Sequence, residues 1–185
     1  MDTATRAAVT LLRQRGAAEL PHPGGTLLAH LERVYETLRS WQVPDPVALA
    51  GLTHAAYGTD GFPEPLLAVT ERPVLRAAIG EDAERIVYAY GGCDRGTVYP
   101  RLSEQDPVFH DRFTGLDHRL TAGDLRAFAD ITAANEIDVV THNPDVMREA
   151  GDALWRLFNR MRDHLGEPAW QACVTTFAPQ PDPPH

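Results

Sequence analysis

The chain contains no lysine, because all 17 of its basic residues are arginine. Catalysis through a Schiff-base lysine is therefore excluded. Cysteine is scarce as well: Cys93 and Cys173 lie far apart and match no zinc or redox spacing, so no disulfide framework is expected. The sequence also lacks a P-loop, a G-x-G-x-x-G motif and a G-x-S-x-G nucleophile motif. These absences argue against several common enzyme classes.

Long apolar runs and clusters of positive charge are missing too. No run of about 18 apolar residues suggests a membrane span, and no N-terminal segment reads as a signal peptide, so a cytoplasmic protein is expected. The net charge of −9 argues against nucleic acid as a partner, since such binding relies on clustered cations. We therefore expect a small-molecule ligand rather than a membrane or nucleic-acid partner.

Helical periodicity dominates the 185 residues, and alternating β-branched runs are absent. The pattern predicts one all-α domain over residues 1–178, with a disordered tail over 179–185. Helices are expected at 5–15, at 27–41, from Asp45-Pro46 through His54, and at 64–70, 72–79, 82–90, 122–141, 145–165 and 168–177. The segment 91–121 is expected to be a long loop over a pocket. The apolar face of helix 145–165 is expected in the core or in a homodimer interface.

Two histidines, His30 and His54, lie on the apolar faces of neighbouring predicted helices. Both should point inward, and two adjacent helices can bring them together. A buried imidazole needs a partner for at least one ring nitrogen, and either a metal ion or a backbone carbonyl can be that partner. The sequence leaves both interpretations open.

The stretch "HLERVYETLRSW", followed by "PVALAGLTHAAYG", resembles the start of the HD-domain superfamily. Its members are all-helical metal enzymes, chiefly phosphohydrolases, with a smaller branch of mixed-valent di-iron oxygenases. His30 and Val34 match the first His-x-x-x-Val of that pattern, and "TAANEID" aligns Asn135 with the final aspartate of the family. The resemblance covers about residues 22–140 and implies a helical bundle with a metal-binding pocket.

Two departures from the HD pattern concern the metal. His54 is followed by Ala55 where the family has an aspartate, and Asn135 offers only a neutral carbonyl. The loss of two negative charges indicates a weakened or absent metal site. His22 and Asp60 could still complete a mononuclear site with the histidine pair, and these ligands would suit Fe, Mn or Zn. The alternative is a surface His22 and a turn-capping Asp60.

The stretch "HAAYGTDGF" (54–62) predicts a sharp turn at the end of the helix that contains His54. A left-handed Gly58 would place Thr59 and the Tyr57 hydroxyl beside His54 at the pocket mouth. A similar His-x-x-Tyr-Gly-Thr turn occurs in an uncharacterised bacterial branch of the HD-like superfamily, which this chain resembles. That likeness implies no particular reaction. The alternative is that Tyr57 is a core aromatic residue and Gly58 an ordinary helix terminus.

Two arginines are candidates for anion binding. Arg95 follows a helix end in "YAYGGCDRG", and Arg72 opens a short helix. A guanidinium group matches carboxylate or phosphate bidentately. For Arg95 the alternative is a structural ion pair with Asp94 or Glu136.

In the predicted helix 122–141, Asn135 and Asp138 share a stripe that is expected to face the core. Asn135 should lie nearest the two histidines, and Asp138 can orient one imidazole. Glu136 is expected to point into solvent.

Two functions remain open. The first is an HD-like enzyme that acts on a small anionic substrate, by hydrolysis or oxygenation with a metal, or by metal-free acid–base chemistry. The second is a non-catalytic ligand-binding or regulatory module that kept the fold and lost the metal site. The catalytic candidates are His54, Tyr57 and His30, and the substrate-binding candidates are Arg95, Arg72, Thr59 and Asn135. Two histidines on apolar faces favour the enzyme.

Overall fold

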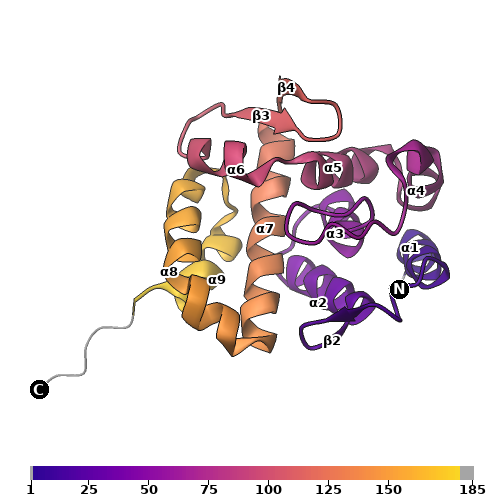
Figure 1. Ribbon diagram of the computed structural model, residues 1–185, viewed down its shortest axis with the longest axis horizontal. Helices are drawn as coiled ribbons and strands as arrows, with labels where there is room; N and C mark the ends of the chain where they lie inside the picture. Colours follow the sequence, from indigo (N-terminus) through magenta and orange to yellow (C-terminus); the bar gives the residue numbers. More distant parts are fainter. Residues whose placement is uncertain (1, 180–185) are drawn as a thin grey trace, which may run out of the picture.

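The longest helix, α7 (Ala122–His142), runs through the centre of the computed structural model, which describes residues 2–179 (Figure 1). Within these residues there are nine α-helices, three short 3-10 helices and two antiparallel hairpins, so the prediction of an all-α fold is confirmed. In chain order the other elements are α1 (Thr3–Gln14), β1 (Pro21–His22), β2 (Gly25–Thr26), α2 (Leu27–Ser40), α3 (Asp45–Thr53), η1 (Val69–Glu71), α4 (Arg72–Ile79), α5 (Glu81–Gly92), α6 (Arg95–Val98), η2 (Tyr99–Arg101), β3 (Val108–Asp111), β4 (Leu116–Arg119), α8 (Pro144–Arg160), η3 (Arg162–His164) and α9 (Glu167–Phe177).

Helix α7 lies between two groups of helices. α2, α3 and α5 contact it on one side, and α8 and α9 contact it on the other (Figure 1). Its small residues, among them Ala127, Ala133 and Ala134, are fully buried and let the neighbouring helices come close. Because both sides of α7 are covered, most of its polar side chains must find partners inside the protein.

Threonine side chains cap the starts of two helices that the sequence predicted. The Thr26 side chain accepts a hydrogen bond from the Ala29 N–H at 3.2 Å and caps α2. Thr121 caps α7 in the same way. One predicted helix, 64–70, is wrong: only the 3-10 turn η1 forms there, since the pair of prolines in "FPEPLL" removes the backbone donors that a helix needs.

The segment 91–121 is not a loop. It contains α6, η2 and a hairpin in which Val108 pairs with Arg119 and Asp111 with Leu116. Phe109 and Asp111 point inward from β3, whereas every residue of β4 is exposed. Two four-residue strands with one polar face give a weak pattern, which explains why the sequence did not reveal them.

The apolar face of α8 belongs mainly to the core. Phe158 is fully buried there, as is Met161 directly after the helix, and Trp155 stacks on Trp170 of α9 with ring centroids 5.6 Å apart. Among residues 2–179, no helix combines the length and the apolar character that a bilayer crossing requires. Of the expected tail 179–185, residues 180–185 lie outside the described part.

Candidate functional site

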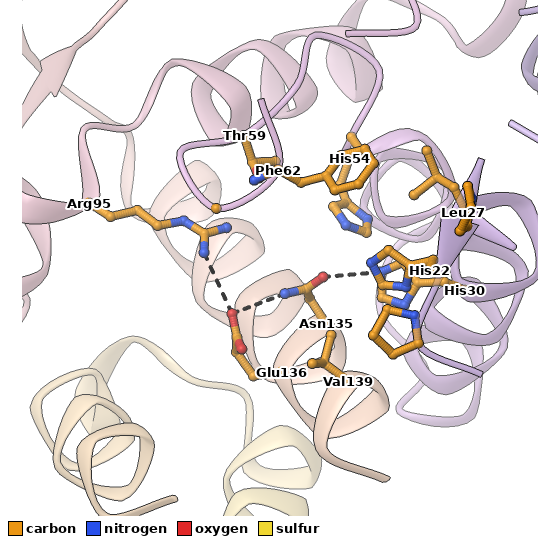
Figure 2. A pocket seen from close by; sticks show the side chains of 14 residues that line it. His22, Leu27, His30, His54, Thr59, Phe62, Arg95, Asn135, Glu136 and Val139 are labelled. Atoms are coloured by element: carbon orange, nitrogen blue, oxygen red, sulfur yellow. Dashed lines mark hydrogen bonds and ion pairs between the residues drawn. The ribbon is translucent and has the colours of Figure 1, made fainter. Parts of the chain in front are cut away.

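A cavity of about 370 Å³ lies between the start of α2, the end of α3, the C-terminal half of α7 and two short turns (Figure 2). Only Arg95 comes from the segment 91–121, and the turns 21–23 and 59–62 supply six of the other thirteen lining residues. The lining residues are Pro21, His22, Pro23, Leu27, His30, His54, Ala55, Thr59, Gly61, Phe62, Arg95, Asn135, Glu136 and Val139.

Three histidines form a column along one wall of the cavity. The rings of His22 and His30 are stacked with centroids 4.0 Å apart, and the His54 ring meets the His30 ring edge-on at 5.3 Å. Helices α2 and α3 approach each other closely at Gly51, where a Cβ atom would lie 2.1 Å from Leu38 Cδ1. This close approach brings His30 and His54 together, as the sequence predicted.

Both ring nitrogens of His30 have partners. Nδ1 lies 2.6 Å from Asp138 Oδ2, and Nε2 lies 3.1 Å from Asn135 Oδ1. These are the two residues of α7 that the sequence placed next to the histidines. Asn135 Nδ2 donates to Glu136 Oε1 at 3.0 Å, which fixes the orientation of the amide. His30 therefore organises the site and has no nitrogen free for a ligand.

Asp138 links His30 to the turn that carries His22. Arg33 donates to the two Asp138 oxygens at 2.6 and 2.8 Å, and to the carbonyl oxygen of Pro23 at 3.1 Å. Burial opposes the charge of Asp138, but the hydrogen bonds from His30 and Arg33 lower its pKa to about 2. The sequence did not identify Arg33, because its only signal is a position three residues after His30.

His54 offers an unprotonated nitrogen to the cavity. Its Nδ1 lies 2.8 Å from the carbonyl oxygen of Gly51. A carbonyl oxygen can only accept, so Nδ1 carries the proton and Nε2 carries the lone pair. Burial, with a smaller effect of His30, lowers the pKa of His54 to about 3. His54 is therefore a neutral hydrogen-bond acceptor near pH 7.

His22 is the second neutral imidazole. Burial, followed by His30, lowers its pKa to about 4. Its Nδ1 is buried and makes no hydrogen bond within residues 2–179. A buried nitrogen without a partner is unusual in a folded protein. Because Nδ1 is not accessible from the cavity, this atom is not itself a contact point for a ligand.

Arg95 and Glu136 form the opposite end of the cavity (Figure 2). Their side chains are only 21% and 14% exposed, and Arg95 Nη1 lies 3.6 Å from Glu136 Oε1, too far for a good hydrogen bond. The Arg95 guanidinium lies over the rings of Tyr90 and Tyr99, 5.9 and 5.7 Å from their centroids, and donates no hydrogen bond to the described part of the chain. Burial raises the pKa of Glu136, and Arg95 opposes that effect.

The prediction that Glu136 points into solvent is thus wrong. The carboxylate lines the cavity because α7 is covered on both sides, so that its residue pattern does not mark a solvent face. Of the two alternatives considered for Arg95, the contact with Glu136 is present. The carboxylate of Asp94 instead accepts from Thr97 N at 2.8 Å and caps α6.

The turn after Gly58 holds Arg95 in place. Gly58 adopts the predicted left-handed conformation, with φ of +68°. Thr59 lines the cavity as expected, and its N–H closes the turn onto Phe62 O at 2.7 Å. Asp60 Oδ2 accepts a hydrogen bond from the Arg95 backbone N–H at 3.0 Å. The turn therefore joins the end of α3 to the start of α6.

Tyr57 and Arg72 lie away from the cavity, in contrast to the prediction. The Tyr57 hydroxyl donates to Glu84 Oε1 at 2.9 Å, so it does not face His54. Arg72 donates to both oxygens of the same carboxylate, at 2.7 and 3.0 Å. Burial, followed by the hydrogen bond to Glu84, raises the pKa of Tyr57. The chain turns at Tyr57, which directs the ring toward α4 and α5 instead of along the line of His54.

The side chains proposed as metal ligands do not assemble into a metal site. Within residues 2–179, no group of three or more His, Cys, Asp or Glu side chains is placed to hold a metal ion. The rings of His22 and His30 are inclined by only 28°, so their in-plane lone pairs cannot converge on one point. His30 is already bonded at both nitrogens, and Asp60 is not among the lining residues. This arrangement does not fit a mononuclear Fe, Mn or Zn centre.

A comparison with known protein families finds a match to part of the chain. Residues 11–95 match the model of a family described as a domain of unknown function, DUF6817. The matched region includes the three histidines of the cavity and ends at Arg95, whereas α7 lies outside it. No curated protein and no solved structure matches the chain.

Proposed function

We propose that this protein is a small-molecule enzyme with an HD-like helical fold, which binds a small anionic substrate through Arg95 and transfers a proton with His54. One observation carries the proposal: a mostly buried guanidinium group that donates no hydrogen bond within the described chain and the lone pair of His54 Nε2 line the same cavity. The HD-like relationship is supported by the order of His30, His54 and Asn135 along the chain and by the contact between His30 and Asn135.

The anion-binding role follows from the environment of Arg95. A guanidinium group with free N–H groups binds carboxylate or phosphate through charge-assisted hydrogen bonds, which strengthen where water is scarce. The cavity volume of about 370 Å³ lies within the usual range for small-molecule sites.

The proton-transfer role depends on the bound anion. With a pKa of about 3, His54 is too weak a base for efficient catalysis near pH 7. Arg95 contributes to the low pKa of His54, so an anion that neutralises Arg95 favours the protonated imidazole and raises the pKa of His54 in the complex. Proton abstraction beside the acid group would then lead to isomerisation or elimination. No step is assigned to a metal, because the side chains do not fit one.

The second candidate function is a non-catalytic ligand-binding module. It is favoured by the saturated hydrogen bonding of His30 and by the low pKa of both His22 and His54. Such a module would use the same Arg95 contact but would leave the ligand unchanged.

Deuterium exchange separates the two candidates without knowledge of the substrate. Wild-type protein is incubated in D₂O with small carboxylates and phosphate esters, and loss of the C–H signal next to the acid group is followed by NMR. The control is His54→Asn, whose side-chain N–H can still donate to the carbonyl of Gly51 while Nε2 is lost. We expect exchange in the wild type that falls by about 100-fold or more in the variant. Binding that depends on Arg95 without exchange indicates the binding module. No binding of any probe would contradict the proposal.

A further inference from the structure

The polar end of the cavity places hydrogen-bond donors and an acceptor side by side. Arg95 Nη1 and Glu136 Oε1 are 3.6 Å apart, and both side chains line the cavity. The guanidinium has N–H groups without partners in the described chain. Glu136 Oε1 accepts one hydrogen bond, from Asn135 Nδ2 at 3.0 Å, and the carboxylate has about four acceptor positions in all. One ligand can therefore contact both residues.

The Glu136 carboxylate is held in position by a chain of contacts that begins at Asn135. Asn135 Oδ1 contacts His30 Nε2, His30 Nδ1 contacts Asp138, and Asp138 is bound by Arg33. Because this chain of contacts fixes the Asn135 amide, it also fixes the N–H that Glu136 accepts. The Glu136 carboxylate is thus positioned before a ligand arrives, which is the usual property of a selective site.

A simple anion does not suit this end of the cavity. A carboxylate bound to Arg95 would lie next to the Glu136 carboxylate, and two like charges repel strongly where solvent is scarce. A ligand avoids this cost if it presents an N–H to Glu136 while its carboxylate contacts Arg95. The separation of 3.6 Å between the two protein atoms matches a ligand whose N–H and carboxylate are attached to the same carbon.

We infer that the ligand is an α-amino or α-amido acid, recognised through its carboxylate by Arg95 and through its N–H by Glu136. This inference rests on the proposed function, since it assumes that an anion binds at Arg95. It makes Glu136 the residue that determines specificity, and it explains why an acidic side chain stands beside the cation of an anion site.

Room for the Arg95 contact is provided by Gly61. A Cβ atom at this position would lie 3.1 Å from Arg95 Nη1, closer than most real contacts. An alanine would have to push the guanidinium by a few tenths of an ångström. Gly61→Ala is therefore a mild perturbation of the arginine that leaves all charges of the cavity in place.

The test compares two probes of the same shape. N-acetylglycine has an N–H next to the carbon that bears the carboxylate, whereas acetoxyacetate has an ester oxygen there. Dissociation constants are measured by calorimetry for the wild type, Glu136→Gln and Arg95→Gln. Glu36→Gln is the control, since it removes the same charge from an exposed position of α2. Circular dichroism establishes that each variant is folded, and Arg95→Lys replaces Arg95→Gln if the latter is not.

We expect the wild type and the control to bind N-acetylglycine at least about tenfold more tightly than acetoxyacetate. In Glu136→Gln the ratio should fall to within about threefold, because acetoxyacetate gains affinity once the repulsion is removed. A matching series with glycine identifies the source of the N–H: tighter binding of glycine indicates a free amino acid, and weaker binding indicates an acylated one.

Two results would overturn the inference while the proposed function stands. The first is that the wild type binds the two probes with equal affinity and that Arg95→Gln binds neither. The other is a preference for N-acetylglycine that persists unchanged in Glu136→Gln. If neither the carboxylate probes nor the phosphate esters bind, or if their binding does not depend on Arg95, then the proposed function itself fails.

Discussion

Two clusters of this protein combine arginine with a buried carboxylate, but they differ in how many hydrogen bonds join the two groups. In the Glu84 cluster, the carboxylate is 0% exposed and accepts from Tyr57, Arg72 and Arg76, so that each oxygen has two donors. In the cavity, Arg95 and Glu136 face each other at 3.6 Å and no hydrogen bond joins them. Buried charges are normally paired and hydrogen-bonded. The satisfied cluster therefore stabilises the fold, and the unsatisfied one is available for a ligand.

The largest effect should come from removing the carboxylate of the satisfied cluster. Glu84→Ala leaves Arg72 without its partner and opens a space in a fully buried position. We expect the free energy of unfolding to fall by about 3–5 kcal/mol, the usual cost of breaking a buried ion pair. Urea denaturation followed by circular dichroism measures it. The matched variant Glu136→Ala should lose less, about 1–2 kcal/mol, because only one hydrogen bond, from Asn135, is removed instead of four. Equal losses in the two variants would remove the distinction between the clusters.

Acid should reduce the contribution of His54 to the free energy of unfolding more than it reduces the contribution of the Glu84 cluster. The pKa of His54 is about 3 in the folded protein, whereas its ordinary value, which applies to the unfolded chain, is 6.5. Between these pH values the unfolded chain takes up a proton that the folded chain does not. Stability is then complete above pH 6.5 and falls as the pH drops toward 3. At pH 5 the loss from His54 is about 2 kcal/mol relative to pH 7, at 1.36 kcal/mol per pKa unit.

Denaturation curves at pH 7 and pH 5 measure this effect. His54→Asn cannot titrate, so its stability should change less between the two pH values than that of the wild type. Asp138 does not interfere, because its pKa of about 2 confines its contribution to the range below its ordinary value of 3.8. A wild type and a variant with the same pH dependence would show that His54 is not held neutral.

The helical fold could be predicted from sequence because its signals are local. Thr26 and Thr121 cap helices that the apolar periodicity had already indicated, and His30 and His54 stand out as polar residues on apolar faces. Their meeting needed only two adjacent helices. The contacts of His30 with Asn135 and Asp138 were also foreseeable, since all three lie on stripes that face the core.

The sequence did not predict the remaining features of the site. They depend on the direction of side chains at a helix end or on a helix that is buried on both sides. Tyr57 lies three residues after His54, but the turn of the chain directs it to Glu84. Glu136 follows Asn135 on a helix without a solvent face, so no periodicity distinguished it. Arg72 and Arg95 look alike in sequence. What separates them is the number of hydrogen bonds their guanidinium groups make, a property of the fold.

Replacing the arginine of the cavity should affect ligand binding more than stability. Arg95→Gln removes a cation that donates no hydrogen bond to the described chain, so the free energy of unfolding should change by about 1 kcal/mol or less. The affinity for N-acetylglycine should fall by about 10- to 100-fold, the usual value of a charge-assisted contact. Calorimetry measures the affinity, and urea denaturation measures the free energy of unfolding. A large loss of stability with unchanged affinity would reverse the roles given to the two clusters.

The smallest effect is expected for Tyr57→Phe, which tests whether the Glu84 cluster is separate from the cavity. The substitution removes one of four donors to Glu84 and retains the buried ring, so that the remaining bonds from Arg72 and Arg76 still satisfy the carboxylate. We expect a loss of about 1 kcal/mol in the free energy of unfolding. Probe affinity and deuterium exchange should stay at wild-type values, because the hydroxyl does not reach His54. A variant of full stability whose exchange rate drops would return Tyr57 to the site and connect the two clusters in function.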